Sequence, residues 1–321
     1  MDNARPAGIF RSAFADWLRV THCTGVHRMK RFRGALTVVA LAVFPSVLAT
    51  PVAGQAASKV AGSFVRVSGS NLYYEECGSG ADAVLLIHDG VVHSAVWDGV
   101  WPALCGRFHV VRYDRRGFGR STPTTTWHFE TDDVAAVLRH AGVTRAVLIG
   151  SSHGGEIAID FTLEHPDAVR QLVLVGAVVG GLPYSEHFNT RTMALIAPLM
   201  KGDIPGGLQN IANDRWLIAP GNDAARKKVL DLLTANPQDV THPNQVLAPK
   251  PALPRLAEIH VRTLILVGDA DIPDVHAHAG AIEAGIPRAR RVVVPGTGHL
   301  MYLEKPDEFA KSEERRVGKE C

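Results

Sequence analysis

The chain lacks a large net charge, a glycine-rich phosphate loop and a cluster of metal ligands. Its 321 residues include 34 Lys and Arg against 32 Asp and Glu, which leaves a formal net charge of +2. So small a charge gives no basis for binding nucleic acid, which calls for a strongly basic surface. We therefore expect no nucleic-acid partner, no bound cofactor and no metal, and a small molecule as the substrate.

Hydrophobic runs long enough to cross a membrane are also missing. The apolar run at residues 35–48 has about 14 residues, whereas a spanning helix needs about 20. Basic residues precede this run and small residues follow it, an order typical of a secretory signal peptide. We expect residues 1–56 to be an N-terminal extension that contains a signal peptide at about 28–56. Met29 is the expected real start of the protein. Secretion or export to the periplasm follows, and an uncleaved membrane anchor is the alternative.

The rest of the composition fits a globular enzyme. Apolar residues make up 46% of the chain and charged residues 21%, which is ordinary usage for a chain that buries a core. The length suits one large domain with an insertion. Residues 312–321 are highly charged without an apolar stripe, and we interpret them as a non-native tail.

The most informative motif is Gly150-Ser151-Ser152-His153-Gly154. It follows an apolar run and precedes a helix-like segment at 156–165. A Gly-x-Ser-x-Gly turn between strand and helix presents its serine openly to a base, and the small residues let the backbones approach closely. This register predicts Ser152 as a nucleophile.

An acid and a histidine follow the serine in the order that such a site requires. Asp271 comes just after the apolar run at 263–268, and His299 follows the run at 291–294. Ligands bind at the carboxyl ends of strands in open α/β sheets, so three loops with the right residue types converge there. Asp269 and Asp274 remain alternatives for the acid.

On these residues the chain resembles the α/β-hydrolase fold superfamily of serine hydrolases, esterase- or lactonase-like and with a cap insertion. The resemblance runs from about residue 63 to 309. It includes the His88-Asp89-Gly90 loop and the turn at 113–121 (Tyr-Asp-Arg-Arg-Gly-Phe-Gly-Arg-Ser). It implies that His299 accepts the Ser152 proton and that Asp271 orients the imidazole.

The resemblance also implies donors for a negatively charged reaction oxygen. The His153 backbone amide is one donor, and the second comes from Gly90 or, one residue along, from Val91. Asp89 stands where the family usually has glycine. Its carboxylate would repel the oxyanion unless it points away or is neutralised.

The fold class implied is α/β: a mostly parallel eight-stranded sheet with helices on both faces and a helical cap. We expect the hydrolase core at 57–178 and 258–311 and the cap at 179–257. The strands are expected at 63–67, 72–77, 84–88, 109–113, 146–150, 172–175, 263–268 and 291–294. Helices are expected at 131–141 and 156–165, and in the cap at 193–200, 208–216 and 224–234.

Several further side chains have structural interpretations. We expect His93 to be a packing or hydrogen-bonding histidine, and Arg115 and Arg116 to be structural ion-pair or turn residues. Trp97 and Trp101 are expected to share one helix face. Apolar cap residues would line an acyl pocket or pack on the core: Met193, Leu195, Ile196, Leu199, Met200, Trp216 and Leu217. In the family's topology, the second strand ends near Cys77 and the fourth begins just after Cys105, so both cysteines lie at the same edge of the sheet. A disulfide is one hypothesis, and two buried thiols are the other.

Three functions fit these features. The first is an exported hydrolase that cleaves a small ester or lactone through an acyl-enzyme. The second keeps the triad but acts on a peptide or C–C bond, or as a cofactor-free perhydrolase. The third is a ligand-binding homologue without catalysis.

Overall fold

The computed structural model describes residues 62–124, 126–242 and 245–310. The signal peptide expected at 28–56 and the tail expected at 312–321 lie outside these residues.

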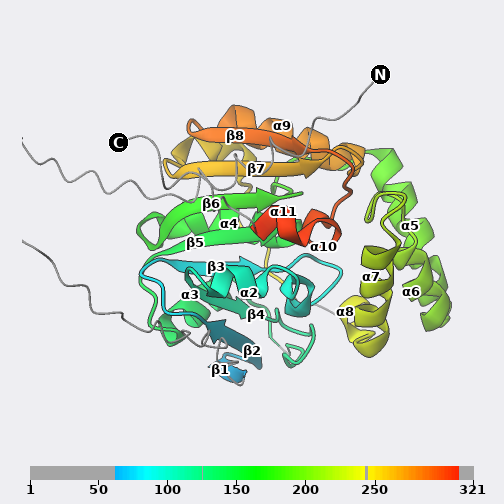
Figure 1. Ribbon diagram of the computed structural model, residues 1–321, viewed down its shortest axis with the longest axis horizontal. Coiled ribbons are helices and arrows are strands. Elements are labelled where there is room, and N and C mark those ends of the chain that lie inside the picture. Colours follow the sequence, from blue (N-terminus) through cyan, green and yellow to red (C-terminus); the bar gives the residue numbers. More distant parts are fainter. Residues whose placement is uncertain (1–61, 125, 243–244, 311–321) are drawn as a thin grey trace, which may run out of the picture.

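A mixed sheet of eight strands runs through the centre of the described part, in the order β1-β2-β4-β3-β5-β6-β7-β8 (Figure 1). β1 and β2 form a hairpin, β2 is antiparallel to β4, and all other neighbours are parallel. This confirms the predicted mostly parallel eight-stranded sheet. The bounds are β1 Ser63–Val67, β2 Ser70–Cys77, β3 Ala83–Ile87, β4 His109–Tyr113, β5 Ala146–Ser151, β6 Val169–Val175, β7 Arg262–Gly268 and β8 Ala289–Val294.

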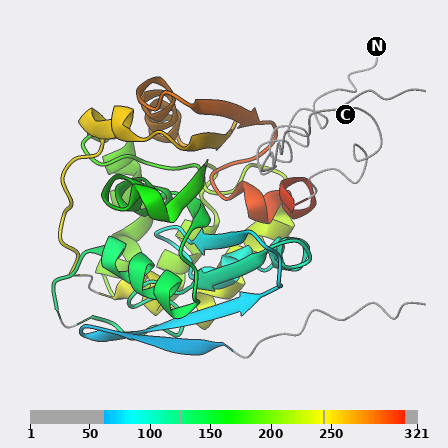
Figure 2. The same cartoon turned by 90° about the vertical axis from the view of Figure 1, so that its left-hand side faces the viewer.

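Both faces of the sheet are buried, because successive side chains of a strand point to opposite faces. Val84 and Leu86 pack on one face, and Leu85 and Ile87 on the other. The first face is covered by η1 (Ser94–Trp97), α2 (Trp101–Cys105), α10 (Met301–Glu304) and α11 (Pro306–Ala310). The second carries α3 (Glu130–His140), α4 (His153–Glu164), η3 (Leu253–Glu258) and α9 (Pro273–Gly285), with the short η2 (Pro166–Ala168) leading into β6. Figure 2 shows α10 and α11 on the opposite side of the sheet from α3, α4 and α9.

Four helices between β6 and β7 lie beyond the carboxyl ends of the parallel strands (Figure 1). They are α5 (Glu186–Met200), α6 (Ile204–Ala212), α7 (Asp223–Ala235) and α8 (Gln238–Thr241). We call these helices and the segments that connect them the cap. Ser185 and Asp203 begin α5 and α6 by accepting hydrogen bonds from backbone amides of the first turn, as N-capping residues do.

Several local expectations were wrong. In the cap, α5 begins seven residues before the expected 193, and α6 covers Ile204–Ala212 where 208–216 was expected. α4 begins at His153, three residues before the expected 156, because the chain turns from strand to helix directly at Ser152. Trp97 and Trp101 do not share a helix face: Trp97 ends η1 and stacks on Tyr302, whereas Trp101 begins α2 and lies under the Arg112 guanidinium.

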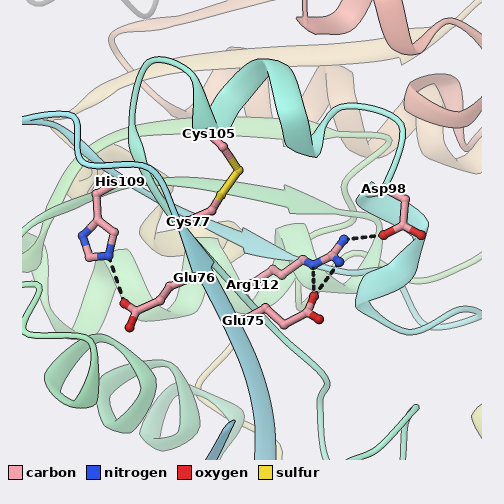
Figure 3. The surroundings of a disulfide bond; sticks show 7 residues. All are labelled: Glu75, Glu76, Cys77, Asp98, Cys105, His109 and Arg112. Carbon is pink, nitrogen blue, oxygen red and sulfur yellow. Dashed lines mark hydrogen bonds and ion pairs between the residues drawn. A yellow bond between two sulfur atoms is a disulfide. The ribbon is translucent and has the colours of Figure 1, made fainter. Parts of the chain in front are cut away.

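Cys77 and Cys105 form a disulfide that joins the end of β2 to the end of α2, with Cα atoms 5.4 Å apart (Figure 3). The disulfide hypothesis is therefore the one that the structure bears out. Next to it, Arg112 forms ion pairs with Glu75 and Asp98.

Candidate active site

Ser152 occupies a strained turn between β5 and α4. Its φ of 52° and ψ of −118° make it the only residue other than glycine with positive φ in the described ranges. Residues other than glycine rarely adopt this backbone conformation, and such strain persists only where the surrounding structure enforces it. The Ser152 amide donates to the Val175 carbonyl (2.9 Å), and its carbonyl accepts from the Gly155 amide (2.9 Å).

The glycines of the motif are needed for close backbone approach. A Cβ at Gly150 would clash with the Gly154 carbonyl oxygen, and a Cβ at Gly154 would clash with the carbonyl oxygens of Ile87 and His88. The Gly-x-Ser-x-Gly spacing thus follows from packing α4 against the ends of β3 and β5.

His299 is buried in the loop after β8 and is held by a carboxylate. Its Nδ1 lies 2.8 Å from Asp271 Oδ1, and Asp271 itself is buried in the loop after β7. A carboxylate only accepts hydrogen bonds, so Nδ1 carries the proton and Nε2 is free to accept one. Burial by itself lowers the pKa of His299, but the carboxylates of Asp271 and Asp89 outweigh burial, and the net pKa is raised.

The two alternative acids have other partners. Asp269 accepts hydrogen bonds from the amides of Gly296 and Thr297. Asp274 accepts from the amide and hydroxyl of Ser185. Asp271 is therefore the acid that the structure places on the imidazole.

The loop after β3 carries the candidate oxyanion donors. Asp89 Oδ1 accepts the amides of Val91 (2.6 Å) and Val92 (3.0 Å), and Oδ2 accepts the Tyr302 hydroxyl (3.0 Å). The Val91 amide is thus engaged, which argues against Val91 as the second donor. No hydrogen bond of the Gly90 amide is found within the described ranges.

The Asp89 carboxylate is turned away from the reaction site. It is completely buried between the amides and Tyr302, whose oxygen also lies 3.0 Å from Ser151 Oγ. Burial raises the pKa of Asp89, and the two amides act in the opposite direction. The Asp89 side chain, where the family usually has glycine, therefore stabilises this loop and does not face the cavity.

A cavity of about 520 Å³ lies between the core and the cap, and Ser152, His153, His299 and Gly90 line it. This volume is within the usual range for small-molecule sites. Of the apolar cap residues that were expected to line a pocket, Leu195, Ile196 and Leu217 do so, together with Phe188, Ile211 and Val240. Met193 and Met200 are exposed instead.

Charged side chains that line the cavity have ion-pair partners, inside or beside it. Arg191 pairs with Asp214, both from the cap, and Arg115 pairs with Glu130. Arg116 pairs with Asp133, so the expectation that both arginines form ion pairs is confirmed. The expected hydrogen-bonding role of His93 is also confirmed, since its Nδ1 lies 2.7 Å from Asp239 Oδ2.

Neither a metal centre nor a membrane helix emerges from the described part. It has no group of three or more His, Cys, Asp or Glu side chains that could hold a metal ion. None of its helices is both long and apolar enough to cross a membrane. A second hollow, of about 570 Å³, lies beside the disulfide and does not include Ser152 or His299.

The model of the alpha/beta hydrolase fold family matches residues 82–306, which span the sheet from β3 onward and the cap. The chain belongs to the alpha/beta hydrolase fold family. It is thus an α/β-fold hydrolase, as the sequence resemblance implied.

Curated relatives of this hydrolase include two kinds of enzyme. A pimeloyl-[acyl-carrier protein] methyl ester esterase of Nitrosomonas europaea is 26% identical, over 75% of this chain and 97% of that protein. A 2-hydroxy-6-oxo-6-phenylhexa-2,4-dienoate hydrolase of Comamonas testosteroni is also 26% identical, over 74% of this chain and 88% of that protein.

Solved structures similar to this hydrolase include a lactone-degrading enzyme and an esterase. Est816, described as an N-acyl homoserine lactone degrading enzyme, is 26% identical with a TM-score of 0.61, and the match covers 77% of this chain and 97% of that one. An esterase from Exiguobacterium antarcticum has a TM-score of 0.66 at 24% identity, covering 78% and 97%, and it supports the fold alone.

Sequence reasoning missed the residues that tie the cap and the loops to the site. Carbonyls of Trp216 and Leu217, in the cap, each accept the His299 amide at 3.0 Å. Asp239 of α8 accepts the His93 ring and the Gly119 amide. No local signal marks these partners, because each bond joins segments far apart in the sequence.

Proposed function

We propose that this hydrolase cleaves a small ester or lactone through an acyl-enzyme, with Ser152 as the nucleophile. The observation that carries the proposal is the convergence of Ser152, on its strained turn, and the Asp271-bound His299 on the wall of one cavity. A serine hydroxyl needs an adjacent base to become an effective nucleophile, and that base must itself be oriented.

In the proposed reaction, His299 Nε2 takes the Ser152 proton as Oγ attacks the carbonyl carbon. The proton then goes to the leaving alcohol, and water releases the acid by the same two steps. Asp271 keeps the proton of His299 on Nδ1 and stabilises the imidazolium. The amides of Gly90 and His153 stabilise the oxyanion, and losing one such donor typically costs about 3 kcal/mol in the barrier.

The substrate class follows from the cavity. Its walls are mainly aliphatic and aromatic side chains, and its charged groups have ion-pair partners. A neutral substrate with a short or medium apolar group fits this lining best. The esterase and lactone-degrading relatives support the same class of bond.

The test is to assay the unsubstituted protein and Ser152→Ala on a panel of p-nitrophenyl esters of increasing chain length and on one acyl lactone. We expect turnover that is lost in Ser152→Ala by a factor of about 10³ or more. Turnover that survives the substitution would reject the acyl-enzyme mechanism. A folded protein without turnover on any ester or lactone would favour the alternatives.

A C–C hydrolase is the second candidate. The Comamonas testosteroni relative is named as the hydrolase of a 2-hydroxy-6-oxo-dienoate, a compound without an ester bond, and it covers a similar share of this chain. Cleavage of a 2-hydroxy-6-oxo-dienoate faster than any ester would favour it. Peptide hydrolysis, perhydrolysis and ligand binding without catalysis have no separate structural support in the described residues.

We also propose export to an oxidising compartment. The Cys77–Cys105 disulfide supports this, because disulfides persist mainly in such compartments, and so does the leader-like pattern at 28–56. Fractionation of cells that express the full chain, with N-terminal sequencing, tests it. Recovery only from the cytosol, with both thiols reduced, would overturn it, and an intact leader in the membrane fraction would indicate an anchor.

A further inference from the structure

One peptide unit governs the second oxyanion donor. The Asp89 carbonyl accepts a hydrogen bond from His88 Nδ1 (2.8 Å) and another from an Arg115 terminal nitrogen (3.0 Å). The Asp89–Gly90 bond is not cis, and in a trans peptide the N–H points away from the C=O. Holding this carbonyl therefore fixes the direction of the Gly90 N–H, on the cavity wall.

Gly90 also lies against the residue that carries the first donor. A Cβ built on Gly90 would be 3.8 Å from the Cβ of His153. The two candidate amides thus belong to neighbouring segments, the loop after β3 and the start of α4. Their relative placement decides whether both can reach one oxygen, since donors must lie about 2.7–3.1 Å from the oxyanion.

A single carboxylate, from Glu130, links these two segments. Its Oε1 accepts Arg115 Nε at 2.8 Å, and its Oε2 lies 2.6 Å from His153 Nε2. Glu130 is the first residue of α3 and its side chain is 10% exposed. The path runs from the Asp89 carbonyl through Arg115 and Glu130 to the His153 ring.

The His153 ring is positively charged and is held between two carboxylates. Both ring nitrogens of His153 face carboxylates, Nε2 facing Glu130 and Nδ1 facing Glu156 (3.0 Å), so both must carry protons. Burial alone lowers the pKa of His153, but Glu130 outweighs it and raises the pKa to about 9. Of the other charged groups nearby, Arg115 lowers the pKa of His153, and His153 in turn lowers the pKa of Asp160.

The neutral ring of His88 completes the arrangement. Its Nε2 accepts the Arg115 backbone amide at 2.9 Å, so its proton is on Nδ1, the atom that donates to the Asp89 carbonyl. Burial holds the pKa of His88 well below its usual value, and Arg115 adds to this effect. The ring therefore stays a neutral donor to that carbonyl.

We propose that Arg115, Glu130 and the His153 side chain are positioning residues that align the Gly90 amide with the His153 amide. This inference rests on the proposed function, because an oxyanion hole presupposes attack on a carbonyl. None of the three side chains needs to touch the substrate. They act by holding one peptide plane and one helix start at a fixed relative distance.

Glu130→Gln tests the proposal, because it keeps the shape of the side chain and removes the charge that unites Arg115 and His153. We expect kcat on the best ester to fall about 10- to 100-fold, as for a small misplacement of reacting groups. KM should change by roughly threefold or less, since the interaction is made in the transition state. The affinity for an aryl trifluoromethyl ketone, whose adduct with Ser152 carries the oxyanion, should fall in parallel with kcat.

Asp133→Asn is the matched control. Asp133 lies on the same helix and pairs with the neighbouring Arg116 through two bonds of 2.7 Å, and this pair is buried at least as deeply as Glu130 and Arg115. No bond connects this pair to the loop after β3. We expect Asp133→Asn to lower the melting temperature while kcat and ketone affinity stay within about threefold of the unsubstituted protein.

A second measurement uses the protonation of His153. Ketone affinity of the unsubstituted protein should fall as pH rises through about 9. In Glu130→Gln this alkaline limb should move to lower pH, because the main group that raises the His153 pKa is gone. If Glu130→Gln does not fold, Arg115→Lys provides the kcat and ketone comparison. Lysine keeps the charge but lacks the fork that holds both Glu130 Oε1 and the Asp89 carbonyl oxygen.

The possible failures are distinguishable. Absence of ester turnover in the unsubstituted protein, or turnover that survives Ser152→Ala, removes the proposed function. If the unsubstituted protein is active, equal losses of kcat in Glu130→Gln and Asp133→Asn overturn the positioning network alone. So do an unchanged ketone affinity or an unmoved alkaline limb.

Discussion

At the scale of single residues, the His299–Asp271 bond should set the pH dependence of the proposed reaction. The net pKa of His299 is raised above 6.5 because its carboxylate neighbours outweigh burial. A general base must be unprotonated, so activity should be lost as pH falls through this raised pKa. We predict an acid limb of kcat/KM with its midpoint above pH 6.5, measured with a neutral p-nitrophenyl ester.

Asp271→Asn serves as the comparison for that limb. An amide cannot hold the imidazole in the same tautomer, and kcat should fall by about 10⁴. The residual acid limb should move to lower pH, because the carboxylate that raises the His299 pKa is gone. Asp269→Asn, whose side chain holds two backbone amides instead, should keep the position of the limb. A limb that stays in place in Asp271→Asn would show that another acid controls His299.

At the scale of elements, Asp239 fastens the cap to the core. From α8 it accepts the amide and ring of His93 (3.1 and 2.7 Å) and the Gly119 amide (2.8 Å), and it is buried. Removing one partner of a buried ion pair typically costs about 3 kcal/mol or more. We predict a loss of this order for Asp239→Ala in urea unfolding, with faster hydrogen exchange in α8 as the local sign of a loosened cap.

The same contact gives a pH dependence. Burial lowers the pKa of His93, but Asp239, with smaller contributions from Asp114 and Asp98, outweighs it and the net pKa is raised. A histidine whose pKa is raised in the folded state stabilises the folded protein when it is protonated. This stabilisation is complete below the unfolded-state pKa of about 6.5 and is lost as pH rises through the folded-state pKa. Stability of the unsubstituted protein should therefore contain a component that declines above pH 6.5. His93→Gln should lack it, and an identical pH profile in that variant would contradict the assignment.

For the molecule as a whole, the disulfide closes a loop with a sequence separation of 28 between β2 and α2. Loop-closure entropy of this size corresponds to about 3.5 kcal/mol of stabilisation. We predict that Cys77→Ser/Cys105→Ser lowers the free energy of unfolding by roughly that amount. Reduction of the unsubstituted protein should have a similar effect.

Activity at 25 °C gives the contrast for this prediction. The cysteines line the second hollow and not the cavity of Ser152 and His299. The double variant should therefore keep its kcat while its unfolding midpoint falls. A large loss of kcat with unchanged stability would contradict a purely stabilising disulfide.

Much of the architecture could be predicted from sequence because it depends on local patterns. Apolar runs of strand length mark the parallel core, since both faces of such strands are buried. The glycines around Ser152 mark a turn where no Cβ fits. Two of the errors in local structure, the start of α4 and the shared face of Trp97 and Trp101, arose where the chain changes direction within a few residues.

The sequence by itself thus determined the sheet, the strand-to-helix turn at Ser152 and the order of serine, acid and histidine, because each is written in neighbouring residues. Only the tertiary structure decided which aspartate meets His299, which amide after His88 stays free, and where the Asp89 carboxylate points. Those outcomes depend on hydrogen-bond partners up to 213 positions apart, such as Tyr302 for Asp89. A buried polar group takes whichever partner the folded chain brings within about 3 Å, and local sequence does not contain that information.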